Sequence, residues 1–479
     1  MAEKIKMRDM VVILPGITGS VLQKDGKDIC AISGQSFWQI LTSLGDSIQQ
    51  LKLIYDDPEA ESLGDGIKPI RIARDIHLIP GLEKVDGYTK TSRLITDNFD
   101  VITGNIYEDA DDKAANFYHF PYDWRRDNRA NARILKKLLD KRLKTWREFS
   151  GNQEAKVILL AHSMGGLVSR YYLEVLQGWQ DCKALFTFGT PYRGSLNSVN
   201  SVANGYKKLF LDFTEVMRSF TSVYQLLPIY EVVKIGDSYQ RVAEADNLPH
   251  IDKQRAADAL AFHRDIEAAV KINWNNEDYR NNYKTIPIIG IQQPTFQSAL
   301  LVDGKLTISE DLPEKLQSRP DLSDGDGTVP QVSAIPIELS NSLNNNFIAE
   351  QHGSLQNSYL ILEDLLNRLA TSQFDLGAVR APQSAISLSL DDLYLTSESI
   401  KMRAKLIATS PGSGKLKATI TSVSDEANTF NFDFEEREKE WVLNVDDLQA
   451  GLYRLKVETE NSGQQFPTPV HGVFEVVKL

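Results

Sequence analysis

The sequence predicts a mostly parallel α/β sheet with helices on both faces, followed by an all-β domain. Four short apolar runs end in turns that contain Gly or Pro, as the buried strands of a parallel sheet do. These runs are residues 10–14, 156–160, 184–188 and 285–291. Segments with helical periodicity lie between them, which is the β-α-β order of a doubly wound sheet. After about residue 380 the pattern changes to alternating apolar and polar residues, which predicts antiparallel strands.

The composition is that of a globular protein and excludes several classes of function. The 479 residues are 42% hydrophobic and 25% charged, enough to bury a sizeable core. The net charge of −12 argues against nucleic acid as a partner. Apolar windows stay below the ~18 residues that a spanning helix needs. The first apolar run is too short for a signal peptide.

Cysteine usage indicates a reducing compartment. Cys30 and Cys182 are the two cysteines of the chain, and neither lies in a CxxC motif or beside clustered histidines. We therefore expect two structural thiols, no metal site and a cytoplasmic location. A single disulfide between the two residues is the alternative.

Two helices flank the second apolar run. Residues 130–149 place Ile134, Leu135, Leu138, Leu139 and Leu143 in one stripe, which predicts an amphipathic helix. Residues 167–177 predict a second helix, directly after the run at 156–160. Together they account for one repeat of the β-α-β unit.

The regular alternation stops at about residues 196–283. This segment mixes helical patches with aromatic and polar residues and is too long for an ordinary loop. We interpret it as a cap inserted over the site, within a first domain that covers residues 1–376.

The remainder of the chain predicts a β-sandwich. Residues 377–383 resemble a linker, and residues 384–479 contain six alternating runs separated by turn residues. This pattern is typical of an immunoglobulin-like sandwich, although a cysteine pair is absent from it. Its lack of clustered catalytic residue types favours a packing role or a surface for a protein partner.

The strongest chemical signal is Ala161-His162-Ser163-Met164-Gly165-Gly166, between a predicted strand and a predicted helix. It matches the G-x-S-x-G nucleophile elbow, with Ala161 in place of the first glycine. Small residues are needed there because neighbouring backbones crowd the strained turn. The elbow exposes the hydroxyl of Ser163 at the N-terminus of a helix, which predicts a nucleophile.

A base and a residue that orients it follow in the expected order. Asp326 lies in Ser323–Pro330 (SDGDGTVP), after the strand at 285–291, and His352 ends a short apolar run. The order Ser, Asp, His is that of α/β-hydrolases, so His352 is the predicted base and Asp326 its partner. Asp324 is the rival partner, and a calcium loop is a weaker reading of Asp-Gly-Asp-Gly.

Two backbone N–H groups are candidates for an oxyanion hole. Met164 begins the helix after the serine, and Ile17 follows the Leu14-Pro15-Gly16 turn that ends the first strand. The alternative for the second segment is a plain Pro-Gly turn.

Taken together, these motifs resemble a bacterial-type member of the lecithin:cholesterol acyltransferase family of α/β-hydrolases. The matching segments also include Pro121-Tyr122-Asp123-Trp124-Arg125 and the run from Gly189 to Ser195, and they cover about residues 10–370. The resemblance implies an α/β-hydrolase fold, the triad Ser163, Asp326 and His352, and the oxyanion donors Ile17 and Met164. It implies that the substrates are acyl esters of lipids and that no cofactor is needed.

The residues that contact substrate are less clearly marked. Phe37 and Trp38 belong to a segment with helical spacing, which is either a lipid-facing helix that allows peripheral contact with a membrane or a helix packed on the hydrolase core. Tyr192, Phe220 and Tyr224 are aromatic candidates for acyl-chain contact, with core packing as the alternative.

The sequence thus predicts a serine-dependent hydrolase of lipid esters, of the lipase or phospholipase type, with an acyltransferase as a variant of the same chemistry. Two alternatives stay open: a hydrolase of soluble esters or thioesters, and a catalytically silent scaffold whose β-sandwich binds a partner.

Overall fold

The computed structural model describes ten stretches of the chain. These are residues 3–29, 49–73, 86–108, 114–208, 211–340, 346–374, 384–407, 414–438, 440–461 and 466–478. The predicted linker 377–383 and the candidate residues Phe37, Trp38 and Cys30 lie outside them.

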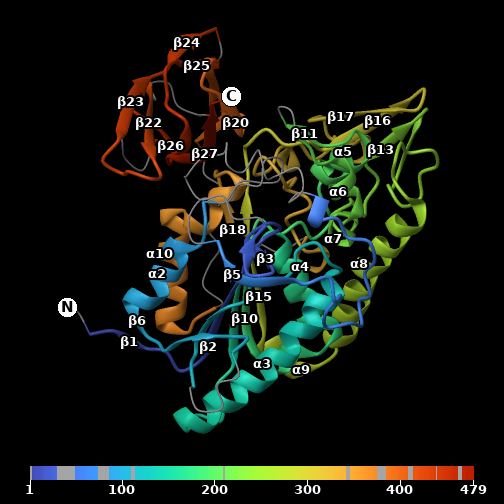
Figure 1. Cartoon of the computed structure of the whole chain (residues 1–479), viewed down its shortest axis with the longest axis vertical. Coiled ribbons are helices and arrows are strands. Elements are labelled where there is room, and N and C mark those ends of the chain that lie inside the picture. The colour runs from blue at the N-terminus through green and yellow to red at the C-terminus, as the bar shows by residue number, and fades with distance from the viewer. Residues whose placement is uncertain are drawn as a thin grey trace.

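A parallel sheet forms the centre of the first part of the molecule (Figure 1). Within the described residues it has seven strands in the order β18-β15-β10-β9-β2-β8-β7, and every neighbouring pair is parallel. Their bounds are β2 Met10–Leu14, β7 Thr103–Asn105, β8 Phe117–His119, β9 Val157–His162, β10 Cys182–Phe188, β15 Lys284–Gly290 and β18 Asn346–Ile348. The four predicted strands are thus confirmed as neighbours in one sheet.

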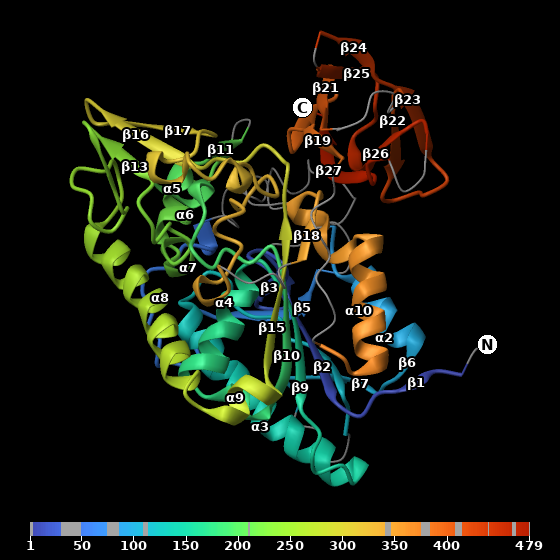
Figure 2. The ribbon, with the colours of Figure 1, turned by 180° about the vertical axis from the view of Figure 1, so that it is seen from behind.

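Alternate residues of the central strands pack against two different layers of helices. In β2, Met10, Val12 and Leu14 belong to one apolar core, whereas Val11 and Ile13 belong to the other. The first core includes helices α3 (Asn128–Ser150) and α4 (Met164–Arg170). The second includes α2 (Thr89–Asn98) and α10 (Tyr359–Thr371). Figure 2 shows these two layers on opposite faces of the sheet.

Local signals fix the ends of the predicted helices. Helix α3 begins after Asp127, whose side chain accepts the Arg129 N–H, and ends at Gly151 with a φ of 70°. The helix predicted at 167–177 begins earlier, at Met164, and its second part is a π-helix, η1 (Tyr171–Val175). The stripe Leu135, Leu139 and Leu143 of α3 is buried, as its spacing predicts.

The segment at 196–283 contains short helices and strands and one long helix. Its elements are α5 Leu196–Ala203, β11 Lys207–Lys208, β12 Leu211–Asp212, α6 Thr214–Ser219, α7 Thr221–Tyr224, β13 Val233–Ile235, β14 Ser238–Gln240, α8 Lys253–Asn273 and α9 Glu277–Asn282. Strands β13 and β14 form a small sheet with β16 (Ser298–Val302) and β17 (Lys305–Ser309). Helix α8 packs on η1, as part of the helical layer that contains α3.

Smaller elements complete the first part of the chain. Strands β1 (Ile5–Lys6) and β6 (Phe99–Asp100) form a parallel pair. Strand β3 (Ser20–Lys24) pairs antiparallel with β4 (Lys27–Asp28) and β5 (Ile67–Ile72). The 3-10 helices are η2 Gly178–Asp181, η3 Glu314–Leu316, η4 Pro320–Leu322, η5 Ile337–Leu339 and η6 His352–Asn357.

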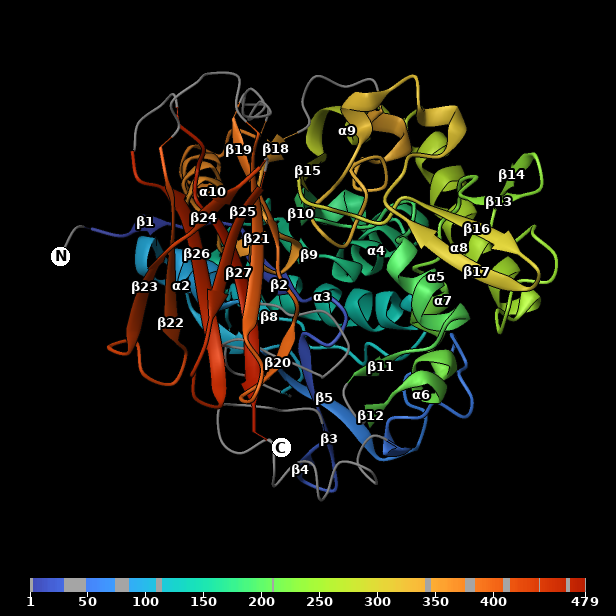
Figure 3. The same cartoon turned by 90° about the horizontal axis from the view of Figure 1, so that it is seen from above.

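Two further sheets follow, which we call the C-terminal sheets (residues 385–477). In the described part of the chain one has the order β19-β21-β25-β24 and the other β20-β27-β26-β22-β23, and they share one apolar core. Their bounds are β19 Ala385–Ser389, β20 Leu393–Leu395, β21 Ile400–Ile407, β22 Leu416–Ser422, β23 Thr429–Asp433, β24 Glu435–Arg437, β25 Glu440–Val445, β26 Gly451–Thr459 and β27 Val470–Val477. Figure 3 shows the strands of the two sheets running alongside one another.

Three of these strands were not among the six predicted runs, because their sequences lack the alternating pattern. β20 and β24 have three residues each, and β27 is buried at nearly every position, so its two faces do not alternate. Most pairs are antiparallel, but β20 and β27 are parallel. The C-terminal sheets lie beyond the carboxyl ends of the central strands (Figures 1 and 2).

Among the described helices we find none with the length and apolar character needed to cross a bilayer.

Candidate active site

Ser163 occupies a sharp turn between β9 and α4. Its φ of 50° and ψ of −125° are rare for a residue with a side chain, and such strain is common at functional sites. The two glycines that follow make the turn feasible. A Cβ on Gly165 would lie 2.4 Å from the Pro15 carbonyl oxygen, and one on Gly166 would lie 2.0 Å from Thr190 Oγ1.

The loop after β2 passes directly beside the serine. A Cβ on Gly16 would lie 2.9 Å from Ser163 Cβ, so only glycine allows this approach. The Tyr122 hydroxyl donates to the Pro15 carbonyl at 2.9 Å and holds the loop from the other side. Ile17 is buried and lines a cavity, while Met164 is the first residue of α4. The N–H groups of a helix's first turn lack partners within the helix, so Met164 is suited to bind an anion.

His352 and Asp326 form a buried pair. His352 Nδ1 lies 2.7 Å from Asp326 Oδ2, and the His352 N–H donates to the Asp326 carbonyl at 2.8 Å. Asp326 Oδ1 accepts the N–H groups of Thr328 and Val329, at 3.0 and 2.7 Å. The carboxylate is thereby fixed by three donors. A carboxylate on Nδ1 places the proton there in neutral histidine and leaves Nε2 as an acceptor.

The carboxylate that contacts His352 is therefore that of Asp326 and not that of Asp324. Asp324 has a φ of 62°, and its carbonyl accepts the Gln331 N–H at 3.0 Å. Burial raises the pKa of its carboxyl group, and the charge of Glu310 adds to this effect. Within the described residues no group of three or more His, Cys, Asp or Glu side chains is placed to hold a metal ion.

Ser163 and the His352–Asp326 pair both lie at the carboxyl edge of the sheet, next to the end of β10. The Ser163 N–H donates to the Phe188 carbonyl at 2.9 Å. A Cβ on the next residue, Gly189, would lie 2.7 Å from Asp326 Oδ2 and 2.9 Å from His352 Nδ1. Parallel α/β sheets bind their ligands at this edge. The fold thus gathers Ser163, Asp326 and His352 from three separate parts of the chain.

His162 connects the same parts through hydrogen bonds that the sequence did not reveal. Its Nε2 lies 3.1 Å from the His352 carbonyl and its Nδ1 lies 3.1 Å from the Tyr88 hydroxyl, which accepts the Gly16 N–H at 2.8 Å. Burial, together with nearby His352, lowers the pKa of His162 to about 3, so the ring is neutral. The Tyr88 hydroxyl then donates to Nδ1, and Nε2–H donates to the His352 carbonyl.

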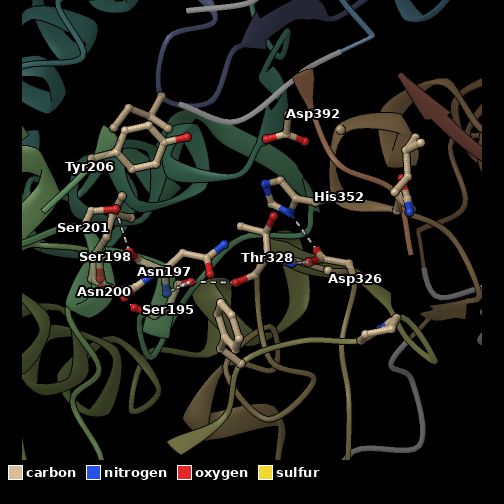
Figure 4. Close-up of a pocket in the computed structure, with 18 of the residues that line it drawn as sticks. Ser195, Asn197, Ser198, Asn200, Ser201, Tyr206, Asp326, Thr328, His352 and Asp392 are labelled. Atoms are coloured by element: carbon tan, nitrogen blue, oxygen red, sulfur yellow. Dashed lines mark hydrogen bonds and ion pairs between the residues drawn. The ribbon is translucent and has the colours of Figure 1, made fainter. Parts of the chain in front are cut away.

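A cavity of about 550 Å³ opens at this site (Figure 4). Ile17, Asp326 and His352 line it on one side, and α5 contributes a polar wall. The residues of that wall are Asn197, Ser198, Asn200 and Ser201, with Ser195 just before the helix. Residues of the C-terminal sheets and their loops also line the cavity: Leu388, Ser389, Leu390, Asp392 and Val473.

The structure places the described aromatic candidates for substrate contact in the core, which is the alternative that the sequence analysis left open. Phe220 is fully buried and packs edge-on against Trp124, with ring centroids 5.5 Å apart. The Tyr224 ring lies under the Arg255 guanidinium at 4.0 Å, and the Tyr192 hydroxyl bonds Thr187 at 2.8 Å. These rings pack in the core and do not line the 550 Å³ cavity. Phe37 and Trp38 lie outside the described residues.

The Tyr-Asp-Trp-Arg block supports the loop beside the serine. Arg125 is fully buried and pairs with Asp123, with Nη2 and Oδ2 2.6 Å apart. Trp124 Nε1 donates to the Ser20 carbonyl at 3.0 Å. The block is therefore a structural support close to β3, which follows the loop.

The parallel sheet with helices on both faces, and the strand–turn–helix around Ser163, fit an α/β-hydrolase fold. Residues 76–312 match the model of the lecithin:cholesterol acyltransferase family, so the predicted resemblance to this family is confirmed.

Two relatives match parts of the chain. Phospholipase A(1) LCAT3 of Arabidopsis thaliana is 27% identical over 264 residues, which are 51% of this chain and 54% of that protein. The lysosomal phospholipase A and acyltransferase of Homo sapiens is 30% identical over 116 residues, which are 22% of this chain and 27% of that protein. The chain thus spans about half the length of the plant relative and less of the human one.

Among solved structures, the propeptide form of the Bacillus licheniformis lipase BlEst2 aligns with 98% of this chain and 93% of its own. Its TM-score is 0.30, at 10% identity. The CARDB domain of the PF1109 protein from Pyrococcus furiosus aligns with 20% of this chain and 89% of its own, with a TM-score of 0.14 and 13% identity. These scores are too low for either likeness to bear on function.

Proposed function

We propose that this protein is a serine-dependent hydrolase of lipid esters that acts through an acyl-enzyme on Ser163. The observation that carries the proposal is the buried pair His352 Nδ1–Asp326 Oδ2, 2.7 Å apart, at the sheet edge that holds the strained serine. A nucleophile needs a base, and the base needs a group that orients it. The family supports a lipid ester as the substrate.

In this mechanism His352 Nε2 takes the proton of Ser163 as its Oγ attacks the ester carbonyl. Asp326 keeps the ring in the required tautomer and stabilises the imidazolium. The N–H groups of Ile17 and Met164 bind the oxyanion of the tetrahedral intermediate. His352 then returns the proton to the leaving alcohol, and the acyl-enzyme forms. Water completes hydrolysis, while an alcohol in its place gives acyl transfer, with no added cofactor.

The wider organisation belongs to the same proposal. Residues 1–376 are the hydrolase domain with the cap at about 196–283, and residues 384–479 are a second domain. The position of α5 on the cavity wall supports a role for α5 in substrate access. Contact with a membrane surface and with a protein partner stays a prediction, as does a cytoplasmic location.

The test measures fatty-acid release from phospholipid vesicles and from a short-chain soluble ester, with wild type and Ser163→Ala side by side. We expect the variant to fold normally and to lose turnover by several orders of magnitude, as for other nucleophiles. A fluorophosphonate should label the wild type and leave the variant unlabelled.

Each result separates the candidate functions. Ser163-dependent release from vesicles supports the lipid esterase, and release from the soluble ester alone moves the substrate away from lipids. Full activity of Ser163→Ala would refute the nucleophile. A wild type without turnover or labelling would favour the silent scaffold.

A further inference from the structure

We propose that the C-terminal sheets are a positioning part of the active site, because they hold the two loops that carry Asp326 and His352. This inference rests on the proposed function, and it concerns a region outside the family match at residues 76–312. The residues that make the connection are Gln293, Glu350 and Gln351. They belong to the segments after β15 and β18, at the carboxyl edge of the central sheet.

Gln293 joins strand β19 to the Asp326 loop. Its side chain is fully buried, with Nε2 donating to the Ile386 carbonyl and Oε1 accepting the Leu388 N–H, both at 3.0 Å. Its backbone pairs with Gly325, through bonds of 2.9 and 3.2 Å. One residue therefore bonds β19 with its side chain and the residue next to Asp326 with its backbone.

Glu350 makes the corresponding connection two residues before His352. Its carboxylate is 1% exposed. Oε1 accepts the N–H groups of Gln351 and His471, at 3.0 and 2.8 Å, and Oε2 lies 2.8 Å from His471 Nδ1. Leaving a buried carboxylate without such donors costs free energy of folding. This contact therefore fixes β27 on the loop that carries His352.

Two more contacts strengthen the connection around His352. Gln351 Nε2 donates to the Leu388 carbonyl at 3.1 Å. On the other side, Arg454 Nε lies 2.8 Å from Asp86 Oδ1, and the Asp86 N–H donates to the Gly353 carbonyl at 2.9 Å. The residues immediately before and after His352 are thus both tied to the C-terminal sheets, the second through Asp86.

The same sheets also close the cavity. Leu388, Leu390, Asp392 and Val473 line it together with His352. Figure 4 shows the Asp392 carboxylate on the side of the His352 ring away from Asp326. A substrate in this cavity would therefore contact both parts of the chain.

This arrangement predicts an effect on the chemical step. If the sheets set the position of the base, loosening them displaces His352 relative to Ser163, and a misplacement of about 1 Å can cost about 10²-fold in rate. Because binding of the acyl group does not depend on the base, kcat falls more than KM rises.

The experiment compares Gln293→Ala with Gln225→Ala in the full-length protein. Gln225 is a matched control, since it is also fully buried and its side chain makes two hydrogen bonds, with Asn128 N–H and Asp127 at 2.8 Å each. Its partners lie at the start of α3, away from the C-terminal sheets. His471→Gln is a milder second variant, because it keeps a polar side chain at a partly exposed site.

We expect Gln293→Ala to lower kcat on the soluble ester by about 10- to 100-fold, and His471→Gln by less, while Gln225→Ala stays within about threefold of wild type. Hydrogen exchange supplies a readout independent of activity. The amides of residues 350–354 should exchange faster in Gln293→Ala and in His471→Gln than in wild type. Their exchange rates should be unchanged in Gln225→Ala.

Unchanged kcat and unchanged exchange in both Gln293→Ala and His471→Gln would overturn the inference. An equal loss of kcat in Gln225→Ala would overturn it as well. A wild type without Ser163-dependent turnover refutes the proposed function instead. In that case the exchange measurement still decides whether the C-terminal sheets hold the loop.

Discussion

At the scale of single residues, the backbone of Ser163 decides whether the site can form. Its φ of 50° is sustained because the loop after β2 and the end of β10 close in on the two following glycines. A side chain on Gly165 would meet a backbone oxygen, which cannot rotate away. The small residues of the elbow are therefore a packing requirement.

We predict that Gly165→Ala destabilises the protein by at least about 1–3 kcal/mol, the usual cost of overpacking, and lowers ester turnover. Gly451→Ala is the control, because a Cβ there would lie no closer than 3.7 Å to Tyr453. Chemical unfolding and turnover should both separate the two variants. Equal stability of the two variants would contradict the conclusion that packing requires a glycine at position 165.

A second residue-scale prediction distinguishes the two aspartates of the Asp-Gly-Asp-Gly run. Asp326→Asn should lower kcat by roughly 10⁴-fold, because the amide favours the wrong tautomer of His352. Asp324→Asn should stay near wild type, since its side chain does not orient the base. The measurement is kcat for both variants on one soluble ester, and the reverse order would show that the orienting residue is misassigned.

At the scale of elements, Tyr88, just before α2, connects the loop after β2 to the elbow. Its hydroxyl accepts the Gly16 N–H and lies 3.1 Å from His162 Nδ1. The Gly16 N–H adjoins the proposed oxyanion donor Ile17. A tyrosine that the sequence did not single out thereby joins two strands of the sheet.

We predict that Tyr88→Phe costs about 1–3 kcal/mol in stability, because it leaves two buried polar groups without their partner. It should also lower kcat, since the loop that carries Ile17 loses its support. Tyr453→Phe is the control, because that partly buried hydroxyl bonds the Gln449 carbonyl at 2.8 Å within the C-terminal sheets. If both variants lose stability alike and only Tyr88→Phe loses kcat, the positioning role is supported. Wild-type kcat in Tyr88→Phe would contradict it.

At the scale of the whole molecule, two buried histidines make stability depend on pH. Burial lowers the pKa of His162 to about 3 and that of His263 to about 4, from 6.5 in the unfolded chain. Below pH 6.5 the unfolded state therefore binds more protons than the folded state. Stability is fully present above that pH and is lost as the pH falls.

We expect the free energy of unfolding to be lower at pH 5 than at pH 7, and the difference to be smaller in His263→Gln. The exposed residue His250 provides the control variant His250→Gln. Denaturant unfolding at the two pH values measures both effects. An equal pH dependence in wild type and in His263→Gln would contradict the assignment to His263.

The sequence was informative where local patterns decide the structure. Four apolar runs predicted neighbouring parallel strands, and the motif around Ser163 predicted the elbow, because strands and tight turns depend on adjacent residues. The resemblance to the family was confirmed over residues 76–312. The sequence left open whether Tyr192, Phe220 and Tyr224 pack in the core or contact substrate, since a buried ring in the core and a ring that lines a cavity have the same sequence pattern.

The sequence by itself thus determined the central sheet, the family and the candidate residues Ser163, Asp326 and His352, through local periodicity and the order of short motifs. Only the tertiary structure decided which aspartate reaches His352, how Tyr88 and His162 connect the loops, and that β19 and β27 contact the segments beside the base. These contacts join residues far apart in the chain, such as Gln293 with Leu388 and Glu350 with His471. The physical reason is that burial and hydrogen bonding across such separations depend on how the packed elements meet, which no local pattern encodes.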